Sequence, residues 1–121
     1  MRFSFRPAEA AEQEQVDLAS LTPVKITGYC LQGKTANGTP VHEGICAYRK
    51  EDIGKFARVY NAVGELIGEY EICDTGRGGV RKGTTVDIWK PTRRECFQLT
   101  QNGYIEVFEK EETDNENVTS D

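Results

Sequence analysis

Short apolar runs separated by glycine, asparagine and proline fill the chain between residues 22 and 108. Residues 24–30 alternate hydrophobic and polar positions, which is typical of a half-buried strand. The same pattern predicts strands at 56–61, 66–73, 84–89 and 104–108, a hairpin turn at 62–65 and a tight turn at Asn37-Gly38. The 12 glycines lie in this region, where the loops of a small barrel need positive φ angles.

A helix interrupts the β pattern after Pro91. Thr92 and Glu95 have the spacing of a capping box, which predicts that the helix begins here, and Gly103 is the expected stop. The apolar face of this helix is expected to consist of Cys96, Phe97, Leu99 and Thr100. A further helical turn is expected near 51–55. The pattern therefore predicts a mainly β domain with one or two short helices packed against a small barrel.

The two ends of the chain differ from its middle in charge. The whole chain carries −5, of which residues 109–121 contribute −5, residues 1–20 contribute −2 and residues 21–108 contribute +2. We expect an N-terminal extension at 1–21, helical in part (8–19) or disordered, then a barrel domain at 22–108. The segment 109–121 is expected to be a disordered acidic tail, because Val118 is its one apolar side chain. The +2 charge of the middle argues against nucleic acid as a partner.

The N-terminal residues do not read as a secretory signal. An acidic, glutamine-rich stretch follows Arg6, where such a signal requires an apolar region. A mean hydropathy of −0.59 and the absence of a long apolar run also argue against a transmembrane segment.

The cysteines and the single histidine give weak chemical signals. None of the four cysteines belongs to a C-x-x-C pair, which argues against a zinc ribbon. Each lies in a local pattern of strand or helix character, which favours a small buried apolar side chain, and one or two disulfides are the alternative. His42 is the one imidazole available to activate a thiol, so Cys–His catalysis is disfavoured. The cysteines are Cys30, Cys46, Cys73 and Cys96.

The segment from Asp74 to Trp89 carries the clearest candidate chemistry. Asp74 ends a predicted strand at a glycine-rich loop, and Asp87 interrupts a strand of strong β character. Because side chains alternate across a strand, Asp87 should face away from Val86 and Ile88. In a partly desolvated cleft its pKa would rise, which suits a general acid. The alternative is that both aspartates accept hydrogen bonds from amides of the glycine-rich loop.

Several short motifs occur in the order seen in the 3D (three-aspartate) domain, which the region 24–108 resembles. These motifs are Ile26–Tyr29, Thr35–Pro40, Gly44–Ala47, Arg58–Tyr60, Asp74–Gly76, Gly78–Gly83 and Val86–Trp89. That family is similar to the catalytic barrel of MltA-type lytic transglycosylases and to the barrels of RlpA-type proteins and expansins. The resemblance implies a six-stranded double-psi β-barrel. Arg49 stands where the family has its first aspartate, and Asp52 follows three residues later. The loop from Asp74 to Asp87 is two residues longer than is usual in the family.

The resemblance also implies a function and a site. It implies a lytic transglycosylase that cleaves peptidoglycan with a 1,6-anhydro product, with Asp87 as the acid and base and Asp74 as its supporting carboxylate. No metal or cofactor is implied, the protein is expected to be a monomer, and its place of action is expected to be the cell envelope or outside the cytoplasm. The residues expected to contact peptidoglycan or another cell-wall glycan are Tyr29, Thr35, Thr39, Tyr48, Lys82 and Trp89.

A binding module that grips glycan without cutting it is the competing interpretation. Arg49 in place of an aspartate favours it, as does the set of basic side chains between Arg77 and Arg94. Those cations either contact acidic groups of the cell wall or form a solvated face. Trp89 is either a stacking face or a core side chain.

Overall fold

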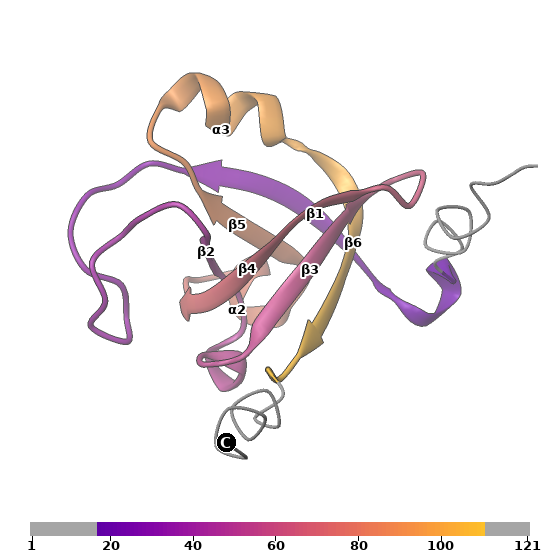
Figure 1. The fold of residues 1–121 in the computed structure, drawn as a ribbon, viewed down its shortest axis with the longest axis horizontal. Coiled ribbons are helices and arrows are strands. Elements are labelled where there is room, and N and C mark those ends of the chain that lie inside the picture. Colours follow the sequence, from indigo (N-terminus) through magenta and orange to yellow (C-terminus); the bar gives the residue numbers. More distant parts are fainter. Residues whose placement is uncertain (1–16, 111–121) are drawn as a thin grey trace, which may run out of the picture.

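The computed structural model describes residues 17–110, which form a closed six-stranded β-barrel with both parallel and antiparallel pairs (Figure 1). The order around the barrel is β1-β5-β2-β4-β3-β6. The mainly β class and the small barrel predicted from the sequence are therefore confirmed. The strands are β1 (Thr22–Tyr29), β2 (Ile45–Ala47), β3 (Phe56–Asn61), β4 (Leu66–Asp74), β5 (Thr85–Trp89) and β6 (Gln101–Phe108).

The barrel encloses one core built from alternate strand residues. Val86 and Ile88 on β5, Ile26 on β1 and Val59 on β3 are fully buried there. Each such side chain contributes about 1.5–3 kcal/mol when it leaves water. Asp87, between two of them, faces the other side of the strand, as the alternation predicted.

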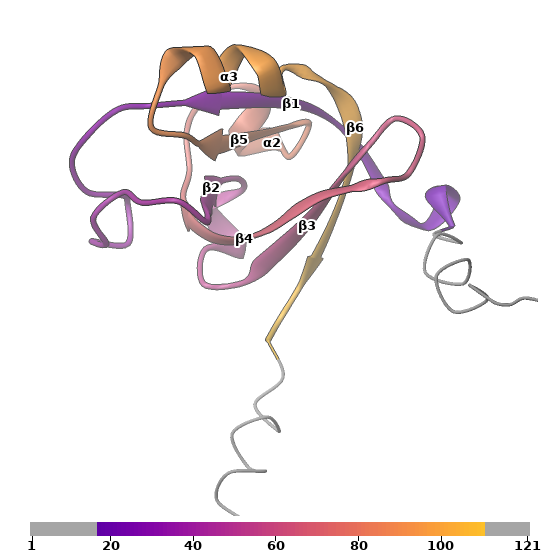
Figure 2. The ribbon, with the colours of Figure 1, turned by 45° about the horizontal axis from the view of Figure 1, so that its top comes forward.

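Two short helices lie within the described residues, α2 (Gly79–Lys82) and α3 (Arg93–Leu99), with 3₁₀ turns at Leu18–Ser20 and Lys50–Asp52. The predicted start of α3 is confirmed, because Thr92 Oγ1 accepts a hydrogen bond from the Glu95 N–H at 3.2 Å. Figure 2 shows α3 lying along β1, outside the barrel wall. Neither helix is long and apolar enough to cross a membrane.

Some boundaries differ from those predicted. The helix α3 ends at Leu99 and not near Gly103, because β6 begins at Gln101 and Gly103 belongs to that strand. The strand β2 was not predicted, since its three residues are all buried and too few to show a periodicity. The short helix α2 in the Asp74–Asp87 loop was also missed. The expectations for residues 1–16 and 111–121 lie outside the described residues.

Gly103 on β6 occupies the tightest point of the barrel wall. It pairs with Val24 on β1 and with Asn61 on β3, so β6 closes the barrel here. A Cβ at this position would overlap the carbonyl oxygen of Tyr60 and press on Ile26. Because the obstacle is backbone, no side-chain rotation relieves it.

The first prediction concerns this contact. Gly103→Ala should lower the free energy of unfolding by about 3 kcal/mol, because an added methyl must push two strands apart. Gly76→Ala is the matched control, since its Cβ would meet Val80 at an ordinary 3.5 Å. Urea denaturation of both variants measures the difference. Equal losses of stability in the two would contradict the account of how the barrel closes.

Candidate active site

Four side chains on adjacent strands form a row across the barrel wall. The register places Thr27 of β1 beside Asp87 of β5, Asp87 beside Ala47 of β2, and Ala47 beside Asp74 of β4. Two strand spacings separate the backbones of the two aspartates, or roughly 10 Å. The small Ala47 side chain between them adds little bulk to the wall. The two carboxylates singled out in the sequence are thus brought to one region by strand pairing.

Asp87 is half-buried, and its surroundings favour the protonated form. Burial raises the pKa of Asp87 above its usual value, and the negative charge of Asp74 raises it further. The Thr27 hydroxyl acts in the opposite direction, because it donates a hydrogen bond to Asp87 Oδ1 at 2.8 Å and stabilises the carboxylate. A carboxyl group whose pKa is raised in this way is suited to donate a proton and to recover it.

Asp74 is held in place by backbone amides. The N–H groups of Ala36 and Thr75 donate to its Oδ1 at 3.0 and 2.9 Å. The interpretation of a carboxylate bound by loop amides therefore applies to Asp74, although the donors are not glycines. The bond to Ala36 also ties the long loop between β1 and β2 to the end of β4.

Two hydroxyl groups near these aspartates are buried without a partner. Among residues 17–110, the Tyr29 hydroxyl and Thr75 Oγ1 make no hydrogen bond although water cannot reach them. Burial raises the pKa of Tyr29, and the charges of Asp74 and Asp87 raise it further. The phenol therefore stays protonated and remains a donor. Buried polar groups without partners are uncommon, which sets these two hydroxyl groups apart from the rest of the described residues.

The other residues predicted to contact glycan occupy varied positions. Thr35 is buried, and its hydroxyl donates to Asn37 Oδ1 within the β1–β2 loop, where Thr39 closes the same turn. Tyr48 is 3% exposed and donates to the Gly83 carbonyl, and Trp89 is 7% exposed and donates to the Leu31 carbonyl. This burial leaves little of either ring for a substrate. Lys82 is exposed at the end of α2, beside Tyr48 and Arg49.

The Arg49 region does not present a third carboxylate. Asp52 is 1% exposed, and its two oxygens bind Arg49 Nε at 2.7 Å and Lys55 Nζ at 3.3 Å. Because both oxygens are taken by cations, the carboxylate of Asp52 is not open to a substrate. Arg49 and Asp52 form a structural ion pair that fixes the connection between β2 and β3.

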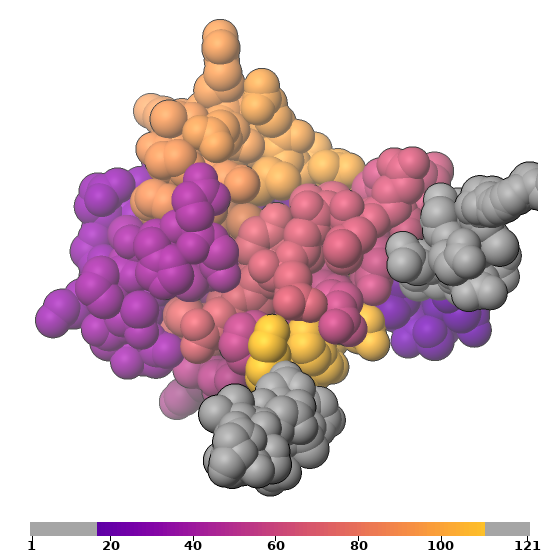
Figure 3. Space-filling view, viewed as in Figure 1, coloured from indigo at the N-terminus to yellow at the C-terminus, as the bar shows by residue number. Residues whose placement is uncertain are grey.

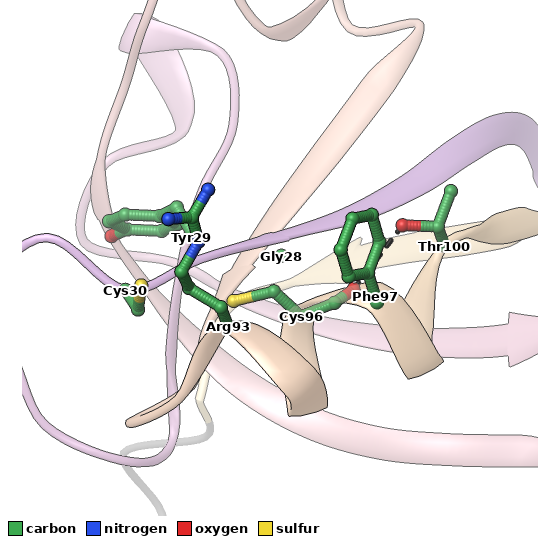
Figure 4. Close-up of a pocket in the computed structure, with 7 residues that line it drawn as sticks. All are labelled: Gly28, Tyr29, Cys30, Arg93, Cys96, Phe97 and Thr100. Carbon is green, nitrogen blue, oxygen red and sulfur yellow. Dashed lines mark hydrogen bonds between the residues drawn. The ribbon is translucent and has the colours of Figure 1, made fainter.

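A pocket beside α3 was missed by the sequence analysis. The expected apolar face of α3 included Phe97, yet this ring is 78% exposed. A cavity of about 250 Å³ lies between α3 and the end of β1, and Figure 4 shows the side chains around it. The helix packs close because β1 carries Gly28, where a Cβ would lie 2.7 Å from the Cys96 Cα. The lining residues are Gly28, Tyr29, Cys30, Arg93, Cys96, Phe97 and Thr100.

The cysteines are free thiols, in two different settings. Cys46 and Cys73 are buried, in agreement with the interpretation of small apolar side chains. Cys30 and Cys96 are half-buried at the pocket. Burial raises the pKa of Cys96, and the neighbouring Cys30 thiol adds to this shift. His42 is exposed and contacts the carbonyl of Glu43, so no imidazole is arranged to activate either thiol.

Comparisons with protein-family models, with curated proteins and with solved structures found no match for the chain. The site is therefore described by its own geometry: a row of Asp74, Ala47, Asp87 and Thr27, with the Tyr29 hydroxyl close by. Within residues 17–110, no three His, Cys, Asp or Glu side chains are grouped as metal ligands.

The second prediction tests the origin of the Asp87 pKa. Thr27→Val removes a hydrogen bond to the carboxylate, so it should raise the pKa of Asp87 further. Asp74→Asn removes a negative charge while keeping an oxygen for the two amides, so it should lower that pKa. Carboxyl ¹³C shifts followed by NMR through a pH titration give both values. Shifts in the same direction, or none, would show that Asp87 does not sense these neighbours.

Proposed function

We propose that this protein is a lytic transglycosylase that acts on peptidoglycan, with a double-psi β-barrel of the 3D-domain type as its catalytic unit. The observation that supports this most is a desolvated carboxyl group, Asp87, flanked by one hydroxyl donor and a second, fixed carboxylate. The parallel pairs β1–β5 and β2–β4 in a closed six-stranded barrel suit the double-psi arrangement. The proposed place of action is the cell envelope.

A single carboxyl group suffices for this reaction. Protonated Asp87 gives its proton to the oxygen of the β-1,4 bond between MurNAc and GlcNAc, and the bond from the anomeric carbon to that oxygen breaks with its electron pair on the oxygen. The C6 hydroxyl of the same MurNAc attacks the anomeric carbon. The Asp87 carboxylate then takes the hydroxyl proton, which restores the acid and leaves a 1,6-anhydro sugar. Ordinary glycosidases need a second carboxyl group to activate water or form a covalent intermediate.

The neighbours of Asp87 have roles in this scheme. The Thr27 hydroxyl holds the carboxyl group in one orientation and stabilises its charged form after proton transfer. Asp74, fixed by two amides, places negative charge near the oxocarbenium-like transition state.

A glycan-binding module without catalysis is the second candidate. The observation that favours it is the Arg49–Asp52 ion pair, which leaves two and not three acidic groups for the site. The barrel would then hold the same polymer through the same surface without breaking it.

The third prediction separates these candidates. Purified protein incubated with peptidoglycan should release 1,6-anhydromuropeptides, identified by mass spectrometry. Asp87→Asn should reduce their release by roughly a hundredfold to ten-thousandfold, as expected for loss of the proton donor. Asn keeps an oxygen to accept from Thr27, so the fold should persist, as checked by circular dichroism.

Other outcomes are equally informative. Intact peptidoglycan together with sedimentation of the protein on it would support the binding module. Reducing ends without anhydro products would indicate hydrolysis. An undiminished yield from Asp87→Asn would show that Asp87 is not the acid.

A further inference from the structure

The pocket beside α3 combines two chemical features that its lining does not use internally, an exposed aromatic ring and a guanidinium that is unpaired within residues 17–110. The Phe97 ring is the most exposed large apolar side chain among residues 17–110. The Arg93 guanidinium, one helical turn earlier, makes no ion pair within the described residues, whereas Lys90 nearby is paired with Glu43. Thr100 lies at the far end, where its hydroxyl donates a hydrogen bond to the Cys96 carbonyl at 3.2 Å. Figure 4 shows Arg93 and Tyr29 toward one end of the pocket and Phe97 and Thr100 toward the other.

Tyr29 connects this pocket to the aspartates. Its side chain lines the pocket, while the charges of Asp74 and Asp87 act on its hydroxyl. The pKa of Cys96, which also lines the pocket, is raised mainly by burial and by the neighbouring Cys30 thiol. The charge of Asp87 raises it further. The pocket is thus linked to the row that contains Asp87 through Tyr29, which follows Thr27 by two residues on β1. In Figure 3, α3 (orange) and the loop between β1 and β2 (purple) border this side of the molecule.

The lining selects one class of occupant. An exposed aromatic ring packs against the apolar C–H face of a sugar ring, and a free guanidinium binds a carboxylate through two parallel hydrogen bonds. A cavity of about 250 Å³ is smaller than the roughly 300–1,000 Å³ of pockets that enclose drug-sized ligands. It suits one sugar ring with its substituent. An anionic chain that approaches two aspartates also needs a cation at the edge of the site.

We propose that the α3 pocket is a subsite for a pyranose ring that carries a carboxylate, with Phe97 as the stacking surface and Arg93 as the carboxylate ligand. This inference rests on the proposed function, in which MurNAc with its lactyl carboxylate is such a ring. It adds Arg93 as the residue that distinguishes acidic from neutral amino-sugar polymers and Phe97 as a contact to both. It also gives the bound chain a direction, from Asp87 past Tyr29 to α3.

The fourth prediction measures binding without turnover. Full-length Asp87→Asn protein is titrated calorimetrically with the peptide-free tetrasaccharide (GlcNAc-MurNAc)₂ and with chitotetraose, which lacks carboxylates. Adding Arg93→Gln should weaken binding of the acidic tetrasaccharide about tenfold and leave chitotetraose unchanged, as expected for a charge-assisted hydrogen bond. Adding Phe97→Ala should weaken both about tenfold.

Two neighbouring residues provide matched controls. Arg94→Gln removes the same charge from the next position of α3, and Gln98→Ala truncates the next side chain after Phe97; neither residue lines the pocket. Both should leave the two affinities unchanged. Because Phe97 and Arg93 are exposed, thermal melts of all variants should match the parent.

The results distinguish this inference from the proposed reaction. Equal effects of Arg93→Gln and Arg94→Gln, an unchanged affinity in Phe97→Ala, or no binding of either tetrasaccharide by the parent would overturn the subsite. If the affinities change as expected while the wild-type protein forms no anhydro product, the subsite stands and the proposed reaction fails. If anhydro products form while Arg93→Gln and Phe97→Ala change neither affinity, the subsite alone fails.

Discussion

The position of β5 between β1 and β2 is the constraint on which the site depends. Pairing on both edges leaves the side chains of β5 just two directions, into the core or out of the barrel wall. Val86 and Ile88 take the core, and Asp87 must therefore lie on the outer face beside Thr27 and Ala47. The carboxyl group is half-buried in this position. The chemistry proposed for Asp87 thus follows from strand order and alternation.

This arrangement lowers stability at neutral pH. Because the pKa of Asp87 is higher in the folded state than in an unfolded chain, the folded state binds more protons at pH values between the two pKa values. The contribution of Asp87 to stability is then fully present below the unfolded pKa and is lost as pH rises through the folded pKa. The apolar core, with its fully buried isoleucines and valines, offsets this loss. A carboxyl group kept in such a place by the rest of the fold is typical of a functional site.

Much of the fold could be predicted because its signals are local. Alternation along β1, β3, β4 and β5 predicted those strands, and the Thr92–Glu95 spacing predicted the start of α3. The end of α3 was predicted wrongly, because a glycine that stops a helix and a glycine that admits a neighbouring backbone look alike in a sequence. Gly103 is of the second kind, and Tyr60 is its neighbour. The three residues of β2 are too few to produce a pattern.

The candidate site, like the fold, could be predicted from the sequence only in part. Asp74 and Asp87 could be singled out because charged residues next to strong β patterns are conspicuous. Their alignment through Ala47, and the hydrogen bond from Thr27, depend on the register of strands far apart in the chain. Phe97 was expected to pack inward, since an aromatic residue on a short helix has the same periodicity whether or not it is covered. Its exposure and its place beside Arg93 follow only from how α3 lies on Gly28.

The most direct test of the account is the pH dependence of kcat/KM for anhydro-product formation by the wild-type protein. If Asp87 is the acid that cleaves the glycosidic bond, the rate falls as pH rises, with a midpoint equal to the pKa of Asp87 measured by NMR in the same buffer. In Thr27→Val both midpoints should then move upward together. A rate that stays constant while Asp87 loses its proton would contradict the central claim.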